Sequence, residues 1–419
     1  MIRRKRNHYS HCVVDMILLP KRPVVVHVTP WYLPHIGGLE RHVEAISNHI
    51  GGFDSVILTP RLPGTSRIDR PSERVTIVRF GPTKFPAERG RTRSISSQEW
   101  LLRLSRLWNL RRTLSRDSFD VLHVHRPPLI ELAYLASKDR THGALRNIAR
   151  RWNRLPSKGR TQILTDHGLF VQPSSPSSLN LKWFMEWVLE EYDHVICVDP
   201  SGYRRAKSIQ ASDPGRFEKV KIHHMPQPID TNLFHSEPLP VGPELRVGYS
   251  GRWERDGMFL LRELVSMNLP GVRYCISGGA TPRDLHEYAH AFNSPGVELR
   301  PNIIDSVELA QFYHGIHVLV DFYRGDGCGR SVLEAMACGR TILRTRSEDT
   351  HPVVDRVTGL LLDPNAASAA QAIRQLAENP QRLVEIGRRA REAVLREYSN
   401  EIVVPQIERL YREGLSARR

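Results

Sequence analysis

From residue 23 onward, short apolar runs alternate with longer stretches in which apolar side chains recur every three or four positions. In the first half the runs are 23–29, 55–59, 75–80, 121–125, 162–166, 194–198 and 219–224. Leu39, Val43, Ile46 and Ile50, at spacings of four, three and four, illustrate the amphipathic helices expected between them. This alternation predicts a doubly wound, parallel α/β sheet.

The alternation stops at 226–244, where five prolines occur without apolar periodicity, and then begins again. A second set of strands is expected at 245–250, 272–277, 297–301, 317–322, 341–345 and 359–363. The predicted parts are a basic tail (1–22), a first domain (23–235), a linker (236–244), a second domain (245–392) and a helical segment (393–419) that packs back on the first domain. Two such domains leave a cleft at the carboxyl ends of their strands, where ligands bind.

The net charge of +15 belongs mainly to the first half of the chain. Residues 1–200 carry 31 Lys and Arg against 18 Asp and Glu, whereas residues 201–419 carry 29 against 27. Two Arg-rich amphipathic runs, 89–116 and 140–160, concentrate this charge. A solvated helix face, an anionic acceptor or membrane surface, and nucleic acid are the alternatives. Because no nucleic-acid-binding pattern accompanies the charge, we expect no nucleic-acid partner.

Chain length and cysteine usage further restrict the kind of protein this can be. A chain of 419 residues exceeds one ordinary core, and no apolar run approaches the roughly 18 residues of a membrane span. The five cysteines are scattered, without a C-x-x-C pair. This argues against a disulfide framework or a cysteine zinc site and favours a reducing, cytoplasmic location. Asp15 interrupts the apolar patch near the N-terminus, so we expect either a disordered tail or a true translation start at Met16 rather than a signal peptide.

Glycine-rich loops are expected at the ends of three predicted strands. Gly37 and Gly38 precede a helix in the first domain, and "GCG" (327–329) precedes one in the second. A helix N-terminus attracts anions, and glycine lets the backbone approach a ligand closely. Arg252 follows the strand 245–250, where its guanidinium could bind a phosphate. Neither a complete G-x-G-x-x-G nor a P-loop is present in the first domain, so the loops favour another ligand that carries a diphosphate.

Seven segments in order strengthen this interpretation. They are "PHIGGLERHV" (34–43), "FDVLHVH" (119–125), "TDHGL" (165–169), "HVICVDPSGY" (194–203), "SGRW" (250–253), "DGCGRSVLEAMACG" (326–339) and "VTGLLLDP" (357–364). Together they resemble the retaining nucleotide-sugar glycosyltransferases of the GT-B fold, glycosyltransferase family four, over about residues 23–395. The most specific segment is 326–339, which reproduces the family's Glu-Gly-x-Gly-x-x-x-x-Glu and Ala-Met-Ala-x-Gly patterns with one change.

The resemblance implies an α/β, GT-B fold in which two Rossmann-like, doubly wound domains face a central cleft. It implies retaining transfer of a sugar from a nucleoside diphosphate, with UDP-sugar favoured and GDP-mannose second, and with no metal or other cofactor. The implied donor-binding residues are Gly37, Gly38, Arg252, Arg255, Asp326, Gly327, Cys328, Gly329, Arg330 and Glu334. The implied catalytic residues are His167, Arg252 and Asp326.

Individual roles follow from the same resemblance. Arg252 would stabilise the departing β-phosphate, and Glu334 would hydrogen-bond the ribose hydroxyls. Asp326 would contact the transferred sugar, helped by the N–H groups of Cys328 and Gly329. His167 would lie beside the reacting sugar.

Several positions depart from the family pattern, among them Gln227 and Pro228 near the linker and His351, and three others lie in the donor-binding segments. Asp326 replaces a Glu, and Asp256 stands at the usual Lys position, so Arg255 is expected to supply the missing cation. Arg330 lies four residues before Glu334, so either an intrahelical ion pair or a phosphate contact is expected.

The two histidines of "FDVLHVH", His123 and His125, are expected to face opposite sides of the sheet, at least one of them as a wall or core residue.

The basic first domain favours an acceptor with phosphate or carboxylate groups, such as a lipid-linked or inositol-phosphate-like molecule at the inner membrane face. Glycolipid, polysaccharide or glycosylated natural-product biosynthesis would use such a reaction. The alternatives are a GT-B epimerase acting on UDP-N-acetylglucosamine and a sugar-nucleotide-binding protein whose catalysis is impaired.

Overall fold

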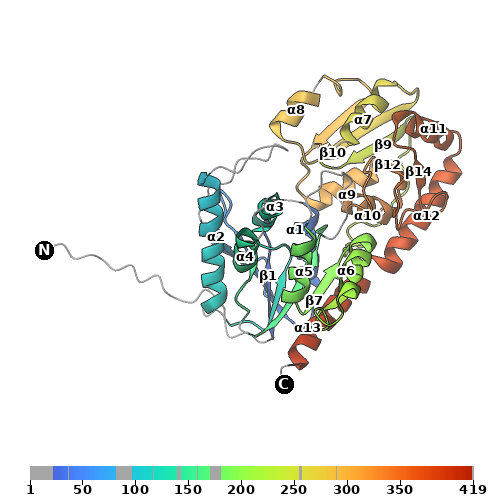
Figure 1. The fold of residues 1–419 in the computed structure, drawn as a ribbon. Helices are drawn as coiled ribbons and strands as arrows, with labels where there is room; N and C mark the ends of the chain where they lie inside the picture. Colours follow the sequence, from blue (N-terminus) through green and yellow to red (C-terminus); the bar gives the residue numbers. More distant parts are fainter. Residues whose placement is uncertain are drawn as a thin grey trace.

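The computed structural model describes residues 22–35, 37–81, 97–116, 118–138, 143–157, 159–169, 181–253, 257–288 and 290–417. The predicted tail, apart from Arg22, lies outside the described residues, as do Arg255 and Asp256. The described chain forms two α/β domains, each built around one mainly parallel sheet (Figure 1). The predicted fold class is therefore confirmed.

The first domain holds an eight-stranded sheet in the order β3-β4-β2-β1-β5-β6-β7-β8. Its strands are β1 Val24–Val28, β2 Asp54–Pro60, β3 Ile68–Asp69, β4 Val75–Phe80, β5 Val121–Val124, β6 Thr161–Asp166, β7 His194–Cys197 and β8 Lys221–His224. Its helices are α1 Gly38–His49, α2 Ser97–Arg116, α3 Ile130–Lys138, α4 Ala144–Asn153, α5 Lys182–Glu191 and α6 Pro200–Ser212. Only β3 pairs antiparallel in the described sheet, and its two residues are too few to show a strand pattern.

The second domain holds a six-stranded parallel sheet in the order β11-β10-β9-β12-β13-β14. Its strands are β9 Leu245–Ser250, β10 Val272–Gly278, β11 Val297–Pro301, β12 Val318–Asp321, β13 Thr341–Thr345 and β14 Leu360–Leu362. Its helices are α7 Gly257–Ser266, α8 Pro282–Tyr288, α9 Ser306–His314, α10 Arg330–Ala337, α11 Ala366–Ala377 and α12 Pro380–Glu397, followed by α13 Asn400–Ser416.

The last helix, α13, returns to the first domain (Figure 1). Val403, Ile407 and Tyr411 of α13 are buried in one cluster with Val25 of β1 and Val121 of β5. By contrast, α12 packs against α10 and β13 of the second domain. The chain thus crosses back at the junction of these two helices, a few residues after the expected boundary at 393, and α13 covers one face of the first sheet.

The chain passes between the two domains twice, near Ile229 and near Ser399, and backbone hydrogen bonds join these two connecting segments. The N–H of Ile229, on the outward crossing, donates to the carbonyl of Tyr398 at 2.7 Å, and the N–H of Asn400 donates to the carbonyl of Ile229 at 2.9 Å. A paired crossing restricts how the two domains can turn relative to each other. No helix among the described residues is both long and apolar enough to cross a bilayer.

Strand order defines where a ligand can bind. The order reverses between β1 and β5 in the first sheet and between β9 and β12 in the second. Ligands of doubly wound sheets bind beyond the carboxyl ends of strands at such reversals. The predicted loops at Gly37, Arg252 and 325–329 follow β1, β9 and β12, so all three lie at these positions.

Candidate active site

The glycine loop of the first domain faces the arginine turn of the second. Gly37 caps the N-terminus of α1, and a Cβ atom built on it would lie 3.9 Å from Nη2 of Arg252. A Cβ atom built on Gly38 would lie 3.9 Å from Cβ of Arg330, the first residue of α10. The N–H groups of a first helical turn and an arginine guanidinium both attract anions. Residues predicted from separate parts of the chain are therefore brought together between the domains.

The loop 325–329 is held from both domains. Gly327 has φ +77°, a conformation that favours glycine, and a Cβ atom there would lie 1.7 Å from Oδ1 of Asp199 in the first domain. The buried Arg344 of β13 donates through Nη2 to the carbonyls of Gly325 at 3.0 Å and Gly327 at 2.6 Å. Its Nη1 pairs with Asp321 of β12. The loop is thus fixed in the second domain and closely approached by the first.

Asp326 contributes to the same rigidity. Its Oδ1 accepts the N–H of Asp349 at 3.0 Å, and the N–H of Gly327 donates to the carbonyl of Asp349 at 3.0 Å. Gly329 caps α10, so its own N–H and that of Cys328 lie at a helix N-terminus. Burial raises the pKa of the Cys328 thiol to about 12, so the thiol stays neutral. A contact between Asp326 and a sugar remains a prediction.

Arg330 forms the intrahelical ion pair that was one of its two expected alternatives. Its Nε lies 2.9 Å from Oε1 of Glu334, with both side chains less than a tenth exposed. Its Nη1 donates to the carbonyl of Pro228 at 2.9 Å. The other oxygen of Glu334 accepts the hydroxyl of Tyr313 at 3.1 Å. Both carboxylate oxygens therefore have one protein partner each, and a ribose hydroxyl would have to use a remaining lone pair or replace one of these partners.

His167 follows β6 and lies against other histidines. Its ring centroid is 4.7 Å from that of His42 in α1 and 6.1 Å from that of His125. Burial lowers the pKa of His167 to about 3, so the imidazole is neutral at physiological pH. A neutral imidazole can accept or donate one hydrogen bond, which suits a sugar hydroxyl.

The expectation that His123 and His125 face opposite sides of the sheet is wrong. Their ring centroids are 4.1 Å apart, because residues two positions apart on a strand share a face. His27 of β1 is the register partner of His123, so it joins the same face. Nδ1 of His123 lies 2.5 Å from the hydroxyl of Tyr411, which binds α13 to this cluster.

Two family descriptions match most of the chain. Residues 36–233 match the family described as Glycosyltransferase Family 4, and residues 244–379 match Glycosyl transferases group 1. The chain is a GT-B glycosyltransferase of the family-four type.

Solved structures agree with this glycosyltransferase fold. Sucrose-phosphate synthase from Thermosynechococcus elongatus is 19% identical, with a TM-score of 0.70 over 94% of this chain and 100% of that one. Anabaena Alr3699/HepE, solved in complex with UDP-glucose, is 16% identical, with a TM-score of 0.64 over 94% and 99% of the two chains. TarM of S. aureus, solved with UDP among its ligands, is 17% identical, with a TM-score of 0.55 over 74% and 58%. A search of curated proteins found no significant match.

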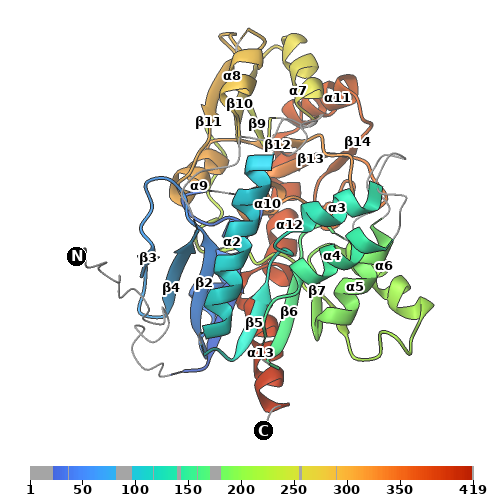
Figure 2. The ribbon, with the colours of Figure 1, turned by 60° about the vertical axis from the view of Figure 1, so that its left-hand side comes forward.

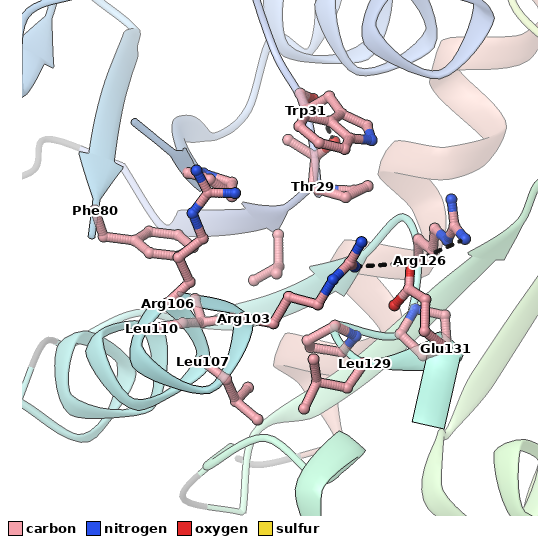
Figure 3. A pocket seen from close by; sticks show the side chains of 15 residues that line it. Thr29, Trp31, Phe80, Arg103, Arg106, Leu107, Leu110, Arg126, Leu129 and Glu131 are labelled. Atoms are coloured by element: carbon pink, nitrogen blue, oxygen red, sulfur yellow. Dashed lines mark hydrogen bonds and ion pairs between the residues drawn. The ribbon is translucent and has the colours of Figure 1, made fainter. Parts of the chain in front are cut away.

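The glycosyltransferase also has a pocket in its first domain, lined by α2 on one side and the ends of β1 and β5 on the other (Figure 3). Its lining is mainly apolar, with three arginines and one glutamate, and the space inside amounts to about 660 Å³, part of it open to solvent. Arg103 and Arg126 lie 3.1 and 3.7 Å from the same oxygen of Glu131. Burial lowers the pKa of the third arginine, Arg106, and the neighbouring Arg103 adds to this effect. The pocket therefore combines an apolar wall with a local excess of positive charge.

Sequence patterns gave no indication of Asp199, the carboxylate that touches the loop 325–329. Burial raises its pKa to about 7, and the negative charges of Asp166 and Asp349 add to the shift, whereas Arg344 opposes it. Asp326 contributes a smaller effect of the same sign as Asp166. A half-buried carboxyl with a raised pKa thus lies where the domains meet.

Asp199→Asn is expected to stabilise the transferase at pH 8 by about 2 kcal/mol and to have little effect at pH 5. Between pH 4 and 7 the folded carboxyl keeps a proton that the unfolded chain has lost, so its contribution to stability falls as pH rises through this window. Asparagine never carries that buried charge. Urea unfolding of both proteins at the two pH values measures the difference, and an equal effect at both would contradict the shift.

His42→Leu is expected to raise the free energy of unfolding in EDTA by about 1–2 kcal/mol. His42 is fully buried, and neither ring nitrogen has a hydrogen-bond partner, so leucine removes an unsatisfied polar group. The matched control is His123→Leu, which removes hydrogen bonds to Tyr411 and Thr165 and should destabilise the protein. Urea unfolding of the three proteins checks the two opposite signs; a loss of stability in both variants would contradict them.

Proposed function

We propose that this glycosyltransferase moves a sugar from UDP to an acceptor with an anionic group, with retention and without a metal ion. The observation that carries the proposal is the approach of Arg252 to the Gly37–Gly38 loop at the two strand-order reversals. Helix N-termini from both domains and an arginine beside one of them match the two phosphates of a nucleoside diphosphate. UDP is favoured because Alr3699/HepE and TarM were both solved with it; GDP-mannose is the second choice.

The proposed reaction depends on stabilising the negative charge of the leaving group. When the bond from the sugar C1 to the β-phosphate oxygen breaks, negative charge develops on UDP, and Arg252 with the N–H groups of α1 and α10 stabilises it. The acceptor oxygen forms its new bond to C1 on the same face. The acceptor proton passes to the departing phosphate oxygen. Neutral His167 holds a sugar hydroxyl, and Asp326 and the N–H groups that follow it orient the sugar.

The pocket under α2 is the proposed acceptor site. It opens next to the end of β1, the strand that leads to Gly37, and it offers apolar walls with Arg103, Arg106 and Arg126 (Figure 3). An acceptor with an apolar body and a phosphate or carboxylate suits both features. A neutral, fully polar acceptor used as efficiently as an anionic one would contradict this assignment.

Membrane contact is proposed for the outer face of α2 and α4. Leu101 and Trp108 of α2 are 69% and 58% exposed, and Ile148 of α4 is 42% exposed. Both helices lie at the front of the first domain in Figure 2. Arg111 donates to the carbonyl of Arg151 at 3.1 Å, so the two helices are adjacent. Apolar side chains beside arginines bind anionic bilayers. Sedimentation with vesicles tests this: binding to phosphatidylglycerol but not to phosphatidylcholine is expected, and equal recovery from both would contradict it.

A nucleotide panel tests the donor proposal. UDP, GDP, ADP and TDP are each added to the full chain with and without EDTA, and the melting temperature is measured. We expect UDP to raise the melting temperature most, by the same amount with and without EDTA, because a ligand that binds the folded state stabilises it by mass action. Stabilisation by GDP alone would mean that the donor is a GDP-sugar rather than a UDP-sugar. Loss of the shift in melting temperature in EDTA would contradict metal independence. No shift with any of the four nucleotides would overturn the proposal.

A further inference from the structure

Five histidines lie together in the first domain and form what we call the histidine cluster: His27, His42, His123, His125 and His167. Four of them are at most 1% exposed, and His167 is half-buried. Within the cluster, His42, His125 and His167 each offer a ring nitrogen, and these three atoms lie within 4.8 Å of one another. They come from α1, the end of β5 and the end of β6, so three separate elements converge on one point.

The free nitrogens of this cluster face no protein partner. Both ring nitrogens of His42, Nδ1 of His125 and Nε2 of His167 are buried without a hydrogen bond. Burial of a polar atom without a partner costs about 1–3 kcal/mol, so three such side chains at one point are not explained by packing. Nitrogen lone pairs that converge in a buried site are what a transition-metal ion requires.

One of the three ligands, His125, is oriented by a neighbouring histidine. Nδ1 of His27 lies 3.1 Å from Nε2 of His125, which fixes the ring of His125 with its Nδ1 free. His123 is fixed in turn by Tyr411 at 2.5 Å and Thr165 at 2.7 Å. Metal-binding histidines commonly have their second nitrogen hydrogen-bonded in this way.

The charged side chains near the site also affect a bound cation. Arg330 and Arg126 both lie near His167. Arg330 pairs with Glu334, and Arg126 shares Glu131 with Arg103, so part of their positive charge is offset.

We propose that His42, His125 and His167 bind one divalent transition-metal ion of the Zn²⁺ class. Three imidazoles without a carboxylate or thiolate select Zn²⁺, Co²⁺, Ni²⁺ or Cu²⁺ over Mg²⁺ and Ca²⁺. Zn–N bonds are about 2.0–2.1 Å long, so the three nitrogens, which lie within 4.8 Å of one another, would have to move closer together to share one ion. His167 would bind the ion through its buried Nε2 and the sugar hydroxyl through Nδ1, so the glycosyl transfer proposed above includes no step through this ion.

Co²⁺ binding to the EDTA-treated, dialysed full chain tests the site. We expect one equivalent to bind with the visible absorption of low-symmetry nitrogen coordination, and Zn²⁺ but not Mg²⁺ to displace it. His42→Leu should weaken Co²⁺ binding at least tenfold. Its unfolding curve in EDTA establishes that the variant is folded.

The matched control is the exposed group His235, Glu237 and His314, whose ligand atoms are also within 4.8 Å of one another. The double variant H235Q/H314Q should keep the visible band and the affinity. The proposal is overturned if Co²⁺ does not bind, if H42L binds it as tightly as the unchanged protein, or if H235Q/H314Q abolishes binding. None of these measurements depends on donor, acceptor or turnover, so they leave the proposed function to its own test.

Discussion

Arg252→Ala is expected to lower kcat/KM for UDP release from the preferred donor by about 10²–10³. Arg252 ends the turn after β9, exposed and within reach of the N-terminus of α1, where the β-phosphate is proposed to lie. An interaction that strengthens as charge develops on the leaving group raises kcat, so its removal should reduce kcat more than it raises KM. UDP release measured over a range of donor concentrations separates the two constants.

Arg374→Ala is the matched control for this variant. Arg374 is an exposed arginine on α11, a helix on the outside of the second domain (Figure 1). The same change in net charge there should leave both constants within about twofold, as expected for a surface substitution far from the chemistry. A loss in the control equal to that of Arg252→Ala would mean that overall charge, rather than a specific contact, supports the reaction.

Gly278→Ala is expected to lower the free energy of unfolding by about 3–5 kcal/mol, from backbone strain and overpacking together. Gly278 ends β10 with φ +109°, and a Cβ atom there would lie 1.8 Å from the carbonyl oxygen of Gly251. Because the nearby atoms are all backbone, no side-chain rotation can relieve the contact. The turn that carries Arg252 would have to move, so UDP release should fall as well.

The next residue provides the control. A Cβ atom at Gly279 would meet only Cγ of Arg252, at 3.9 Å, which is ordinary van der Waals contact. Gly279→Ala should therefore change stability by less than about 1 kcal/mol. Urea unfolding of both variants compares their free energies of unfolding. Equal decreases in the two variants would show that contact with Gly251 is not the reason for glycine at position 278.

The sequence predicted the second sheet and all parallel strands of the first, because buried parallel strands are continuous apolar runs. It missed β3, a two-residue edge strand. It also placed the glycine loops correctly at the strand ends, since a loop between a strand and an amphipathic helix is visible in the pattern. The return of the chain to the first domain was predicted, but the residues that α13 buries were not.

What the sequence could not provide are contacts between distant residues. Asp199 and Gly327 are far apart along the chain and belong to different domains, so no local pattern pairs them. His42 is one polar position in an amphipathic helix, and no local pattern in 393–419 indicates that Tyr411 contacts His123. The strand register that aligns His27 with His123 cannot be seen in the sequence. The expectation for His123 and His125 failed for another reason, because alternate residues on a strand share a face.

The most direct test of the central claim, transfer from a nucleoside diphosphate sugar, is donor consumption in EDTA followed by NMR. The full chain is incubated with UDP-glucose, UDP-galactose, UDP-N-acetylglucosamine and GDP-mannose in turn, without acceptor. We predict slow release of UDP from one UDP-sugar, with the sugar appearing first as the anomer that the donor carries. An epimerised UDP-sugar would identify an epimerase instead, and the opposite anomer would contradict retention. If no donor is consumed and no nucleotide raises the melting temperature, the claim is wrong.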